Sequence, residues 1–457
     1  MVEKQIITSV LHNRGFLNLW INQILVQLSF NALNFALIVW VFRLTDSNIA
    51  VSALLFAFYL PAVMLGLFSG ILIDIVDRRK IIMIINLFLC LSFFSLIFLK
   101  TNYLAILAIT FFINALGHIY ATAEASAIPI IVKGNQLIIA NSMFSTTLYS
   151  CFLLGFGVSG PLITLLGIDF VFKIGGILLA LAFLLSLVFP SIIGAIDDRS
   201  RKLIQAIRRW NFRGIIEVGG VEINQTLMLI KGQLPILTSI LILAGVQMVV
   251  GVIAVLVPSF LEKTLQINAT DASYILIIPL GLGIVTGGII LGRFGYQLVK
   301  RRLVSRAIIF SGLLFFLVGA APIISPAIRH LPYYKPLPFF YQPPLSKIMM
   351  VGSFLMGIAM VSILVPSQTV LQQNTSDSVR GKVFSMLGVA MSGLSLIPVV
   401  LAGVLADFFG STPIFIGLGA VIILVGLFGL NPSLFFKKQD LHFKIREFLG
   451  LGHWEGK

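Results

Sequence analysis

The chain has 457 residues, of which 58% are hydrophobic and only 11% charged, and its mean hydropathy is +1.05. This composition is too apolar for a water-soluble fold and predicts an integral membrane protein. The net charge of +15 lies in loops that flank apolar stretches, so we expect contacts with membrane lipids and no nucleic acid.

Apolar stretches of about 20 residues, the length that a helix needs to cross a bilayer, recur along the chain. In chain order the predicted spans are 16–42, 49–73, 81–99, 103–128, 142–166, 170–193, 235–261, 272–295, 304–325, 347–371, 383–407 and 412–432. The sequence therefore predicts an all-α membrane protein with twelve transmembrane helices.

The basic residues predict the orientation of these spans. With both termini inside, 25 of the 32 Lys and Arg residues fall in cytoplasmic segments. Cytoplasmic loops carry such an excess of basic residues. We therefore expect a multi-pass protein of the cell membrane (inner or plasma membrane) with both termini in the cytoplasm.

The twelve spans divide into two halves of similar plan. Pro61 and Gly70 in span two have counterparts in Pro279 and Gly288, each 218 residues further on. This repeat predicts two pseudo-symmetric six-helix bundles. The expected organisation is an N-terminal bundle over 1–193, a cytoplasmic amphipathic linker over 194–234, a C-terminal bundle over 235–432 and a cytoplasmic amphipathic tail over 433–457.

A cluster of charges ends the second span, where the stretch that begins at Gly70 reads GILIDIVDRRK. Its Gly-x-x-x-Asp-x-x-x-Arg-Arg pattern resembles the signature loop of the major facilitator superfamily. Asp77-Arg78-Arg79 resembles the variant found in the macrolide-efflux and siderophore (enterobactin)-exporter branch. The loop that ends in Arg380-Gly-Lys-Val383 resembles the span 10–11 loop of that branch.

The resemblance implies a secondary active transporter that works by alternating access. Its branch implies an antiporter that exports amphipathic small molecules such as drugs, macrolides or siderophores. Two alternatives stay open: a transporter of lysophospholipids or lipid precursors, and a non-transporting membrane receptor or scaffold built on a transporter fold.

Two predicted helices carry polar side chains along one face. In span one the spacing is i, i+4, i+8 and i+11, an arc of about 80° on a helix, and in span four it is i, i+4 and i+8. The resemblance implies that spans one, four, seven and ten line a central cavity; the alternative is hydrogen bonding between helices. The cavity candidates are Gln23, Gln27, Asn31, Asn34, Asn114, His118, Thr122, Gln247, Met356 and Met360.

Amides on one wall and methionines on the other suit an amphipathic, largely uncharged substrate. Proton coupling needs a titratable group inside the membrane. His118 and Glu124 are the candidates, although a neutral, hydrogen-bonded histidine is an equally good interpretation of His118.

The resemblance also implies a conformational latch. Asp74 is expected to face the start of span eleven near Val383, where unpaired backbone N–H groups attract an anion, with Arg78 holding it in place. The latch residues are Gly70, Asp74, Asp77, Arg78, Arg79 and Arg380.

Enzyme chemistry is not expected. An enzyme acting on lipids would need paired acids or a His/Asp constellation near the membrane interface, and His118 with Glu124 is too sparse for that. The sequence also lacks a nucleotide-binding loop of the Gly-x-x-x-x-Gly-Lys-Ser/Thr kind, so an ATP-driven pump is not expected. Its two cysteines, Cys90 and Cys151, lie inside predicted spans. We therefore expect no catalytic residue, no metal and no cofactor other than an ion gradient, with protons as the coupling ion. The expected partners are a small-molecule substrate and membrane lipids, for a monomeric protein.

Overall fold

The structure is a computed structural model, and it describes residues 12–66, 76–132, 136–192, 233–294, 300–329, 344–375 and 380–430, together with Val10 and Ile73. Within these ranges every regular element is a helix. Twelve helices are long and apolar enough to cross a membrane. The prediction of an all-α protein with twelve transmembrane helices is confirmed, while the predicted linker and tail lie almost entirely outside the described residues.

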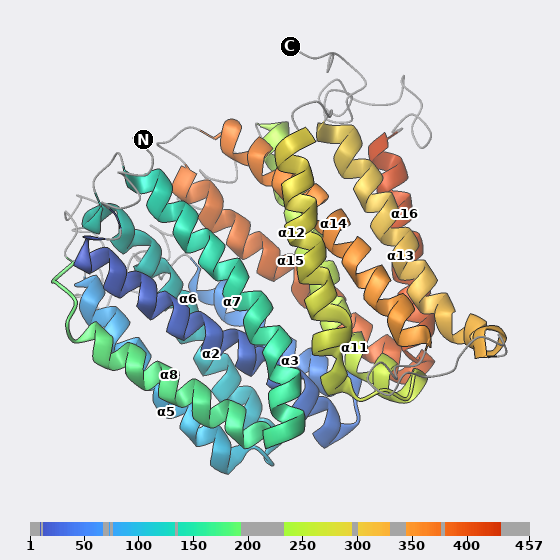
Figure 1. The fold of residues 1–457 in the computed structure, drawn as a ribbon, viewed down its shortest axis with the longest axis horizontal. Coiled ribbons are helices and arrows are strands. Elements are labelled where there is room, and N and C mark those ends of the chain that lie inside the picture. The colour runs from blue at the N-terminus through green and yellow to red at the C-terminus, as the bar shows by residue number, and fades with distance from the viewer. Residues whose placement is uncertain are drawn as a thin grey trace, which may run out of the picture. The chain divides into compact units, whose positions relative to one another are not determined.

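The chain divides into two compact units (Figure 1). Unit 1 comprises residues 1–46 and 50–228; unit 2 comprises residues 229–457 and the short segment Ser47–Ile49. The helices of the first half are α2 (Arg14–Thr45), α3 (Asn48–Leu65), α5 (Arg78–Leu99), α6 (Tyr103–Ile131), α7 (Leu137–Leu166) and α8 (Ile168–Ser186).

The helices of the second half follow in the same order. They are α11 (Leu234–Ser259), α12 (Ile278–Phe294), α13 (Lys300–Arg329), α14 (Pro344–Gln373), α15 (Arg380–Phe409) and α16 (Ser411–Leu430). Short π-helical turns, Phe260–Thr264 and Ser273–Ile277, extend α11 and precede α12, with a 3₁₀ turn at Ala269–Asp271 between them.

Four helix pairs pack together at corresponding places in both units. In unit 1, α2 packs on α7 and α6, and α5 packs on α8 and α6. The helices at the corresponding places in unit 2 repeat this pattern, since α11 packs on α15 and α14, and α13 packs on α16 and α14. The internal repeat of the sequence thus has a counterpart in the packing of each unit.

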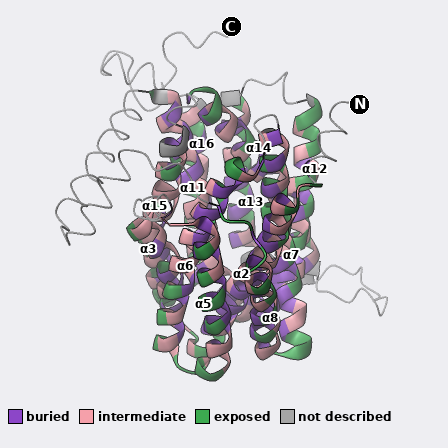
Figure 2. Ribbon diagram, turned by 90° about the vertical axis from the view of Figure 1, so that its left-hand side faces the viewer, coloured by how far each residue is buried: buried purple, intermediate pink, exposed green. Residues whose placement is uncertain are grey.

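Burial follows one face of each helix rather than its whole circumference. Exposed and buried residues alternate along the same helices (Figure 2). Phe98, Leu104 and Leu165 are large apolar side chains with 82%, 72% and 79% of their surface exposed. In a membrane-spanning chain such side chains face lipid, which is as apolar as they are.

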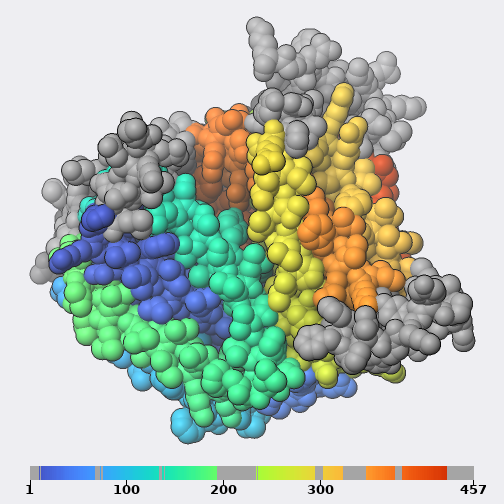
Figure 3. All heavy atoms as spheres, viewed as in Figure 1, coloured from blue at the N-terminus to red at the C-terminus, as the bar shows by residue number. Residues whose placement is uncertain are grey.

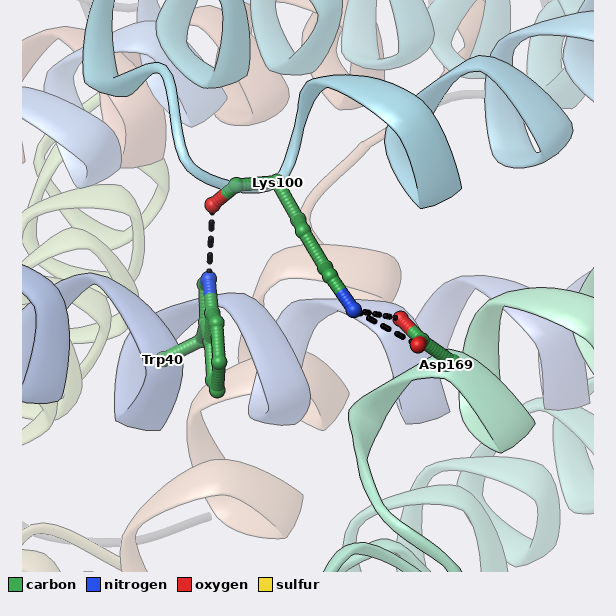
Figure 4. Close-up of polar contacts among 3 residues, drawn as sticks. All are labelled: Trp40, Lys100 and Asp169. Carbon is green, nitrogen blue, oxygen red and sulfur yellow. Dashed lines mark hydrogen bonds and ion pairs between the residues drawn. The ribbon is translucent and has the colours of Figure 1, made fainter.

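One end of unit 1 is fixed by polar contacts among three helices. The Lys100 ammonium lies 2.6 Å from both carboxylate oxygens of Asp169, the second residue of α8. The Lys100 carbonyl oxygen accepts a hydrogen bond of 2.8 Å from the Trp40 indole of α2 (Figure 4). These contacts join α2, the α5–α6 turn and the start of α8.

Glycines set the closest approach in unit 2. Gly283 and Gly287 of α12 face α14, and Gly357 of α14 faces α12. The two helices lie side by side in the ribbon and space-filling views (Figures 1 and 3). Small residues at such positions let two backbones meet, which provides packing energy inside a membrane.

Candidate substrate cavity and buried acid

A cavity of about 240 Å³ opens inside unit 1 between α2, α3 and α6. Three of the predicted cavity residues, Gln27, Asn114 and His118, contribute to its wall. The remaining lining residues are Val26, Phe30, Phe58, Ala62, Gly117, Tyr120 and Ala121. The wall therefore combines two amides, an imidazole and a phenol with aliphatic and aromatic surface, and none of the described residues that line it is Asp, Glu, Lys or Arg.

The local sequence shapes this wall. A Cβ atom at Gly117 of α6 would lie 2.6 Å from the Phe30 ring. Glycine at this position therefore leaves the space that the ring occupies. Asn114 Nδ2 donates to the Thr110 carbonyl oxygen at 2.9 Å, one turn earlier in α6. This bond fixes the Asn114 amide and uses only one of its donors, so the group keeps further hydrogen-bonding capacity.

The other polar residues of α2 and α6 do not line this cavity. Gln23 is 2% exposed and donates to the Phe144 carbonyl oxygen of α7 at 3.2 Å. Asn31 packs against Gly155 of α7, and its Nδ2 donates to the Gln27 carbonyl oxygen at 2.8 Å. These two residues of the predicted stripe join α2 to α7.

The remaining predicted cavity residues also lie outside the lining of this cavity. Asn34 Oδ1 is buried and has no hydrogen-bond partner among the described atoms. Thr122 Oγ1 donates to the His118 carbonyl oxygen at 2.9 Å. In unit 2, Gln247 of α11 and Met356 and Met360 of α14 are half-buried.

A buried acid lies beside the cavity. Glu124 of α6 is 5% exposed, and its Oε1 lies 3.0 Å from the hydroxyl oxygen of Tyr120, one turn earlier. That hydroxyl also lies 2.9 Å from Asn22 Oδ1 of α2, and Asn22 Oδ1 accepts from Asn86 Nδ2 of α5 at 3.3 Å. A buried network thus joins α6, α2 and α5.

Sequence reasoning selected Glu124 but missed the three other members of this network. Tyr120 lies at i−4 to Glu124, which a helical wheel places on the same face. Asn22 and Asn86 are fully buried amides in apolar spans, which in a membrane need partners. Their spacing along the chain carries no periodic signal, so only the folded structure brings them together.

The described part of the predicted latch makes contacts inside unit 1. Asp77 caps α5: its carboxylate accepts from Arg79 N at 3.0 Å, Ile192 N at 2.9 Å and Ser191 Oγ at 2.7 Å. Partial burial opposes the charge, but these hydrogen bonds and the charge of Lys80 hold the pKa of Asp77 below its usual value.

The neighbouring arginines bind the same region. Arg78 is 6% exposed; its Nε donates to Ser126 Oγ of α6 at 3.4 Å. Arg79 donates to the Leu187 carbonyl oxygen at 2.6 Å. Gly70 and Asp74 lie outside the described residues, as does the side chain of Arg380, so the latch itself stays a prediction.

Metal chemistry has little support in the described ranges, which contain no group of three His, Cys, Asp or Glu residues placed to hold a metal ion. Cys90 and Cys151 are buried, unlinked thiols.

Comparisons with known proteins agree with this architecture. A family model described as Major Facilitator Superfamily matches residues 19–334. A solved structure of a POT family transporter in complex with 5-aminolevulinic acid has a TM-score of 0.70 at 12% identity, covering 93% of this chain and 97% of the other. A mutant of the nucleoside transporter NupG has a TM-score of 0.64 at 15% identity, covering 91% and 100%.

A third structure, the POT family transporter PepTSo, has a TM-score of 0.68 at 13% identity and covers 94% of this chain and 99% of its own. Among proteins with curated functional descriptions, none matches the sequence. At these identities the solved structures show a shared fold, and the substrates in their names are properties of those proteins.

Proposed function

Since the chain belongs to the Major Facilitator Superfamily, and is therefore a multi-pass secondary transporter and not an enzyme, we propose that it exports amphipathic, largely uncharged small organic molecules. The observation that carries this proposal is the cavity of unit 1, where Gln27, Asn114 and His118 lie among aromatic and aliphatic side chains. A few polar groups in an apolar wall are typical of sites for drug-like molecules.

The chemistry of the wall argues against charged metabolites. A phosphate or carboxylate is usually held by Arg or Lys in a geometry that recognises it directly, and neither occurs among the lining residues that the structure describes. Its volume of about 240 Å³ is below the range of about 300–1,000 Å³ for complete ligand sites. We infer that it receives one moiety of a larger molecule, such as a macrolide or siderophore.

The direction of transport and the coupling ion belong to the same proposal. Export by antiport is favoured by the resemblance of Asp77-Arg78-Arg79 to the macrolide-efflux and siderophore-exporter branch. A proton is favoured as the coupling ion because Glu124, a buried acid, and His118, a cavity residue, lie in or beside the same site. Ionisable residues inside a membrane protein commonly mark proton pathways.

A lysophospholipid or lipid precursor is the second candidate substrate. It is favoured by a groove of about 400 Å³ between α13 and α14, whose described lining residues are apolar except for Lys347 in the first turn of α14. An acyl chain fits such a wall, and a lipid phosphate fits a nearby ammonium group.

The test is a flux assay with the full chain in proteoliposomes. A panel of dyes, macrolides, siderophores and labelled lysophospholipid is measured with and without a proton gradient. We expect gradient-dependent movement of at least one amphipathic compound, and Asn114→Leu and Gln27→Leu are each expected to weaken it about five-fold through loss of about 1 kcal/mol of hydrogen bonding.

Thr286→Val is the matched control. The Thr286 side chain is partly exposed on α12, and its hydroxyl donates to the Leu282 carbonyl oxygen within its own helix. Transport of labelled lysophospholipid alone would favour the second candidate. Unchanged dye or macrolide flux in both cavity variants would contradict the assignment of the cavity.

A further inference from the structure

In the network around Glu124, one hydroxyl group lies within hydrogen-bond distance of two oxygen atoms that could each accept its proton. The Tyr120 oxygen lies 2.9 Å from Asn22 Oδ1 and 3.0 Å from Glu124 Oε1. Both distances are within hydrogen-bond range. A phenol has a single proton, so it can donate to one of these oxygens only.

The orientation of the Asn22 amide decides between the possible arrangements. Asn22 Nδ2 donates to the Ala182 carbonyl oxygen of α8 at 2.7 Å, so the other end of the amide, Oδ1, faces Tyr120 as an acceptor. Asn22 Oδ1 also accepts from Asn86 Nδ2 at 3.3 Å, but two oxygens 2.9 Å apart still need a proton between them, and Tyr120 is the group that can supply it. The contact between Tyr120 and Glu124 is then a hydrogen bond only if Glu124 supplies a proton of its own.

The complete set of contacts thus describes a protonated Glu124. With Glu124 protonated, its carboxyl donates to the Tyr120 oxygen across the 3.0 Å contact, the Tyr120 hydroxyl donates to Asn22 Oδ1, and Asn22 Nδ2 donates to the Ala182 carbonyl oxygen. When Glu124 releases its proton to water, the carboxylate competes with Asn22 for the one phenolic proton. The bond between α6 and α2 is then lost.

The surroundings of Glu124 offer limited compensation for a negative charge. The helices that pack most extensively on α6 are α2, α5 and α7. The neighbouring helix α3, whose titratable group is Tyr59, contacts α6 through the bond from the Tyr103 hydroxyl to the Ala50 carbonyl oxygen and shares the cavity wall with it. The charged residues of the first three helices are Arg14 and Arg43 at the two ends of α2, and Arg78, Arg79 and Lys80 at the start of α5; α7 has none. Cys90 of α5 and Tyr149 and Cys151 of α7 are their other titratable groups, and His118 is a further one on α6.

Arg78 is the cation that faces this part of α6, since its Nε donates to Ser126 Oγ two residues beyond Glu124. Within the described residues it makes no ion pair with Glu124, whose one side-chain partner there is Tyr120. An unpaired carboxylate in an apolar interior costs several kcal/mol.

We propose that Glu124 is the site that binds the coupling proton and that Tyr120 links its protonation to the substrate cavity. Tyr120 is suited to this because it both lines the cavity and holds Glu124 to Asn22. This inference rests on the proposed transport function and identifies the residues that couple transport to proton binding. When Glu124 loses its proton, the Tyr120 hydroxyl changes the oxygen to which it donates. Because Tyr120 is part of the cavity wall, this change links proton binding to substrate binding.

The first experiment needs no substrate. Infrared spectra of the full chain in lipid nanodiscs are recorded over a pH series for the wild type, Glu124→Gln, Tyr120→Phe and Glu262→Gln. We expect the band of a protonated carboxyl group at neutral pH in the wild type, its absence in Glu124→Gln, and a shifted band in Tyr120→Phe because a hydrogen bond is lost. Glu262→Gln, a matched substitution in unit 2, keeps the wild-type band.

Thermal stability over the same pH series is the second readout. The wild type is expected to lose stability as pH rises through the range in which its band disappears, because the protonated form completes the network. Glu124→Gln keeps its stability through that range, since a neutral amide donates to Tyr120 as the protonated carboxyl does. Tyr120→Phe is less stable overall and loses less stability over that range.

The inference is overturned if the wild type shows no band that Glu124→Gln removes, or if Tyr120→Phe leaves both the band and the pH dependence of stability unchanged. If Glu124→Gln does not fold, the shift of the band in Tyr120→Phe decides the question. These readouts separate the inference from the proposed function, because they can succeed when no compound of the flux panel moves. Conversely, ethidium flux that keeps its proton dependence in both Glu124→Gln and Tyr120→Phe would refute the coupling role alone.

Discussion

Alanine at Gly283 is expected to destabilise unit 2, whereas alanine at Gly288, five residues further along α12, is expected to be harmless. A Cβ atom at Gly283 would overlap the carbonyl oxygen of Phe354 and lie 3.1 Å from the Cα of Gly357. Both obstacles are backbone atoms of α14, so a change of rotamer cannot relieve them. At Gly288 the added atom meets nothing within 4 Å.

The magnitudes follow from two opposing effects. Overpacking costs about 1–3 kcal/mol, and an obstacle made of backbone on a partner helix favours the upper end. Replacing glycine by alanine inside a helix returns about 1 kcal/mol. We therefore expect a net loss of about 2 kcal/mol for Gly283→Ala and a gain of up to about 1 kcal/mol for Gly288→Ala.

The measurement is the unfolding transition of the purified full chain, followed for the two variants and the wild type under the same conditions. Gly357→Ala should behave like Gly283→Ala, since its Cβ atom would meet the carbonyl oxygen of Leu280 on α12. Equal stability of the Gly283 and Gly288 variants would refute the reasoning, because it would mean that α12 and α14 can separate at no cost.

Three further substitutions test polar contacts. Asp77→Asn keeps one oxygen to cap α5 but loses the negative charge and the second acceptor, which bonds Ser191 Oγ, and is expected to cost about 1 kcal/mol at neutral pH. Because the pKa of Asp77 is lowered in the folded chain, this stabilisation is present above the usual aspartate value of about 3.9 and is lost as pH falls through the lowered pKa. The wild-type and variant unfolding transitions should therefore converge in acid. Trp40→Phe leaves the Lys100 carbonyl oxygen without its indole donor and should lower the free energy of unfolding by about 1 kcal/mol. Asp407→Ala removes the carboxylate that accepts from Asn48 N at 2.8 Å and Ile49 N at 3.0 Å, and the same assay should show a loss of about 1 kcal/mol.

The twelve spans could be predicted because the bilayer leaves a strong signal in the sequence. A run of apolar residues of fixed length can satisfy its backbone in lipid only as a helix. The predicted span 142–166, for example, corresponds to the apolar part of α7, which the structure extends from Leu137 to Leu166.

The site was harder to predict than the fold. Gln27, Asn114 and His118 were found because helical periodicity places polar residues of one helix on a common face, and the cavity lies where two such faces meet. The same periodicity could not separate Gln27 from Gln23 and Asn31, which lie within 40° on the helical wheel and contact α7 instead. How neighbouring helices divide such a stripe depends on their rotation, which the pattern of one helix does not contain.

The glycines of α12 show the same limit. The sequence repeats small residues four apart at Gly283 and Gly287 and again at Gly288 and Gly292, and both pairs fit the pattern of close helix packing. Only the first pair touches α14, and nothing lies within 4 Å of a Cβ atom at either residue of the second. One residue of offset turns a glycine by about 100° on a helix, so spacing predicts that a helix packs closely without predicting which pair does so.

The two units satisfy the demands of the membrane in different ways, and this difference bears on where coupling can occur. Unit 2 packs α12 on α14 and α13 on α16 through glycines such as Gly283 and Gly419, and the atoms nearest to these glycines belong to backbone, aliphatic and hydroxyl groups, which do not titrate near neutral pH. Unit 1 instead places a buried acid, a phenol and two amides at the meeting point of α2, α5 and α6. A buried polar group without a partner is costly in an apolar interior, and the gain or loss of one proton changes which of these bonds can form. A proton-driven change of helix packing can therefore start from the unit 1 network, and the glycine contacts of unit 2 have no group through which to start one.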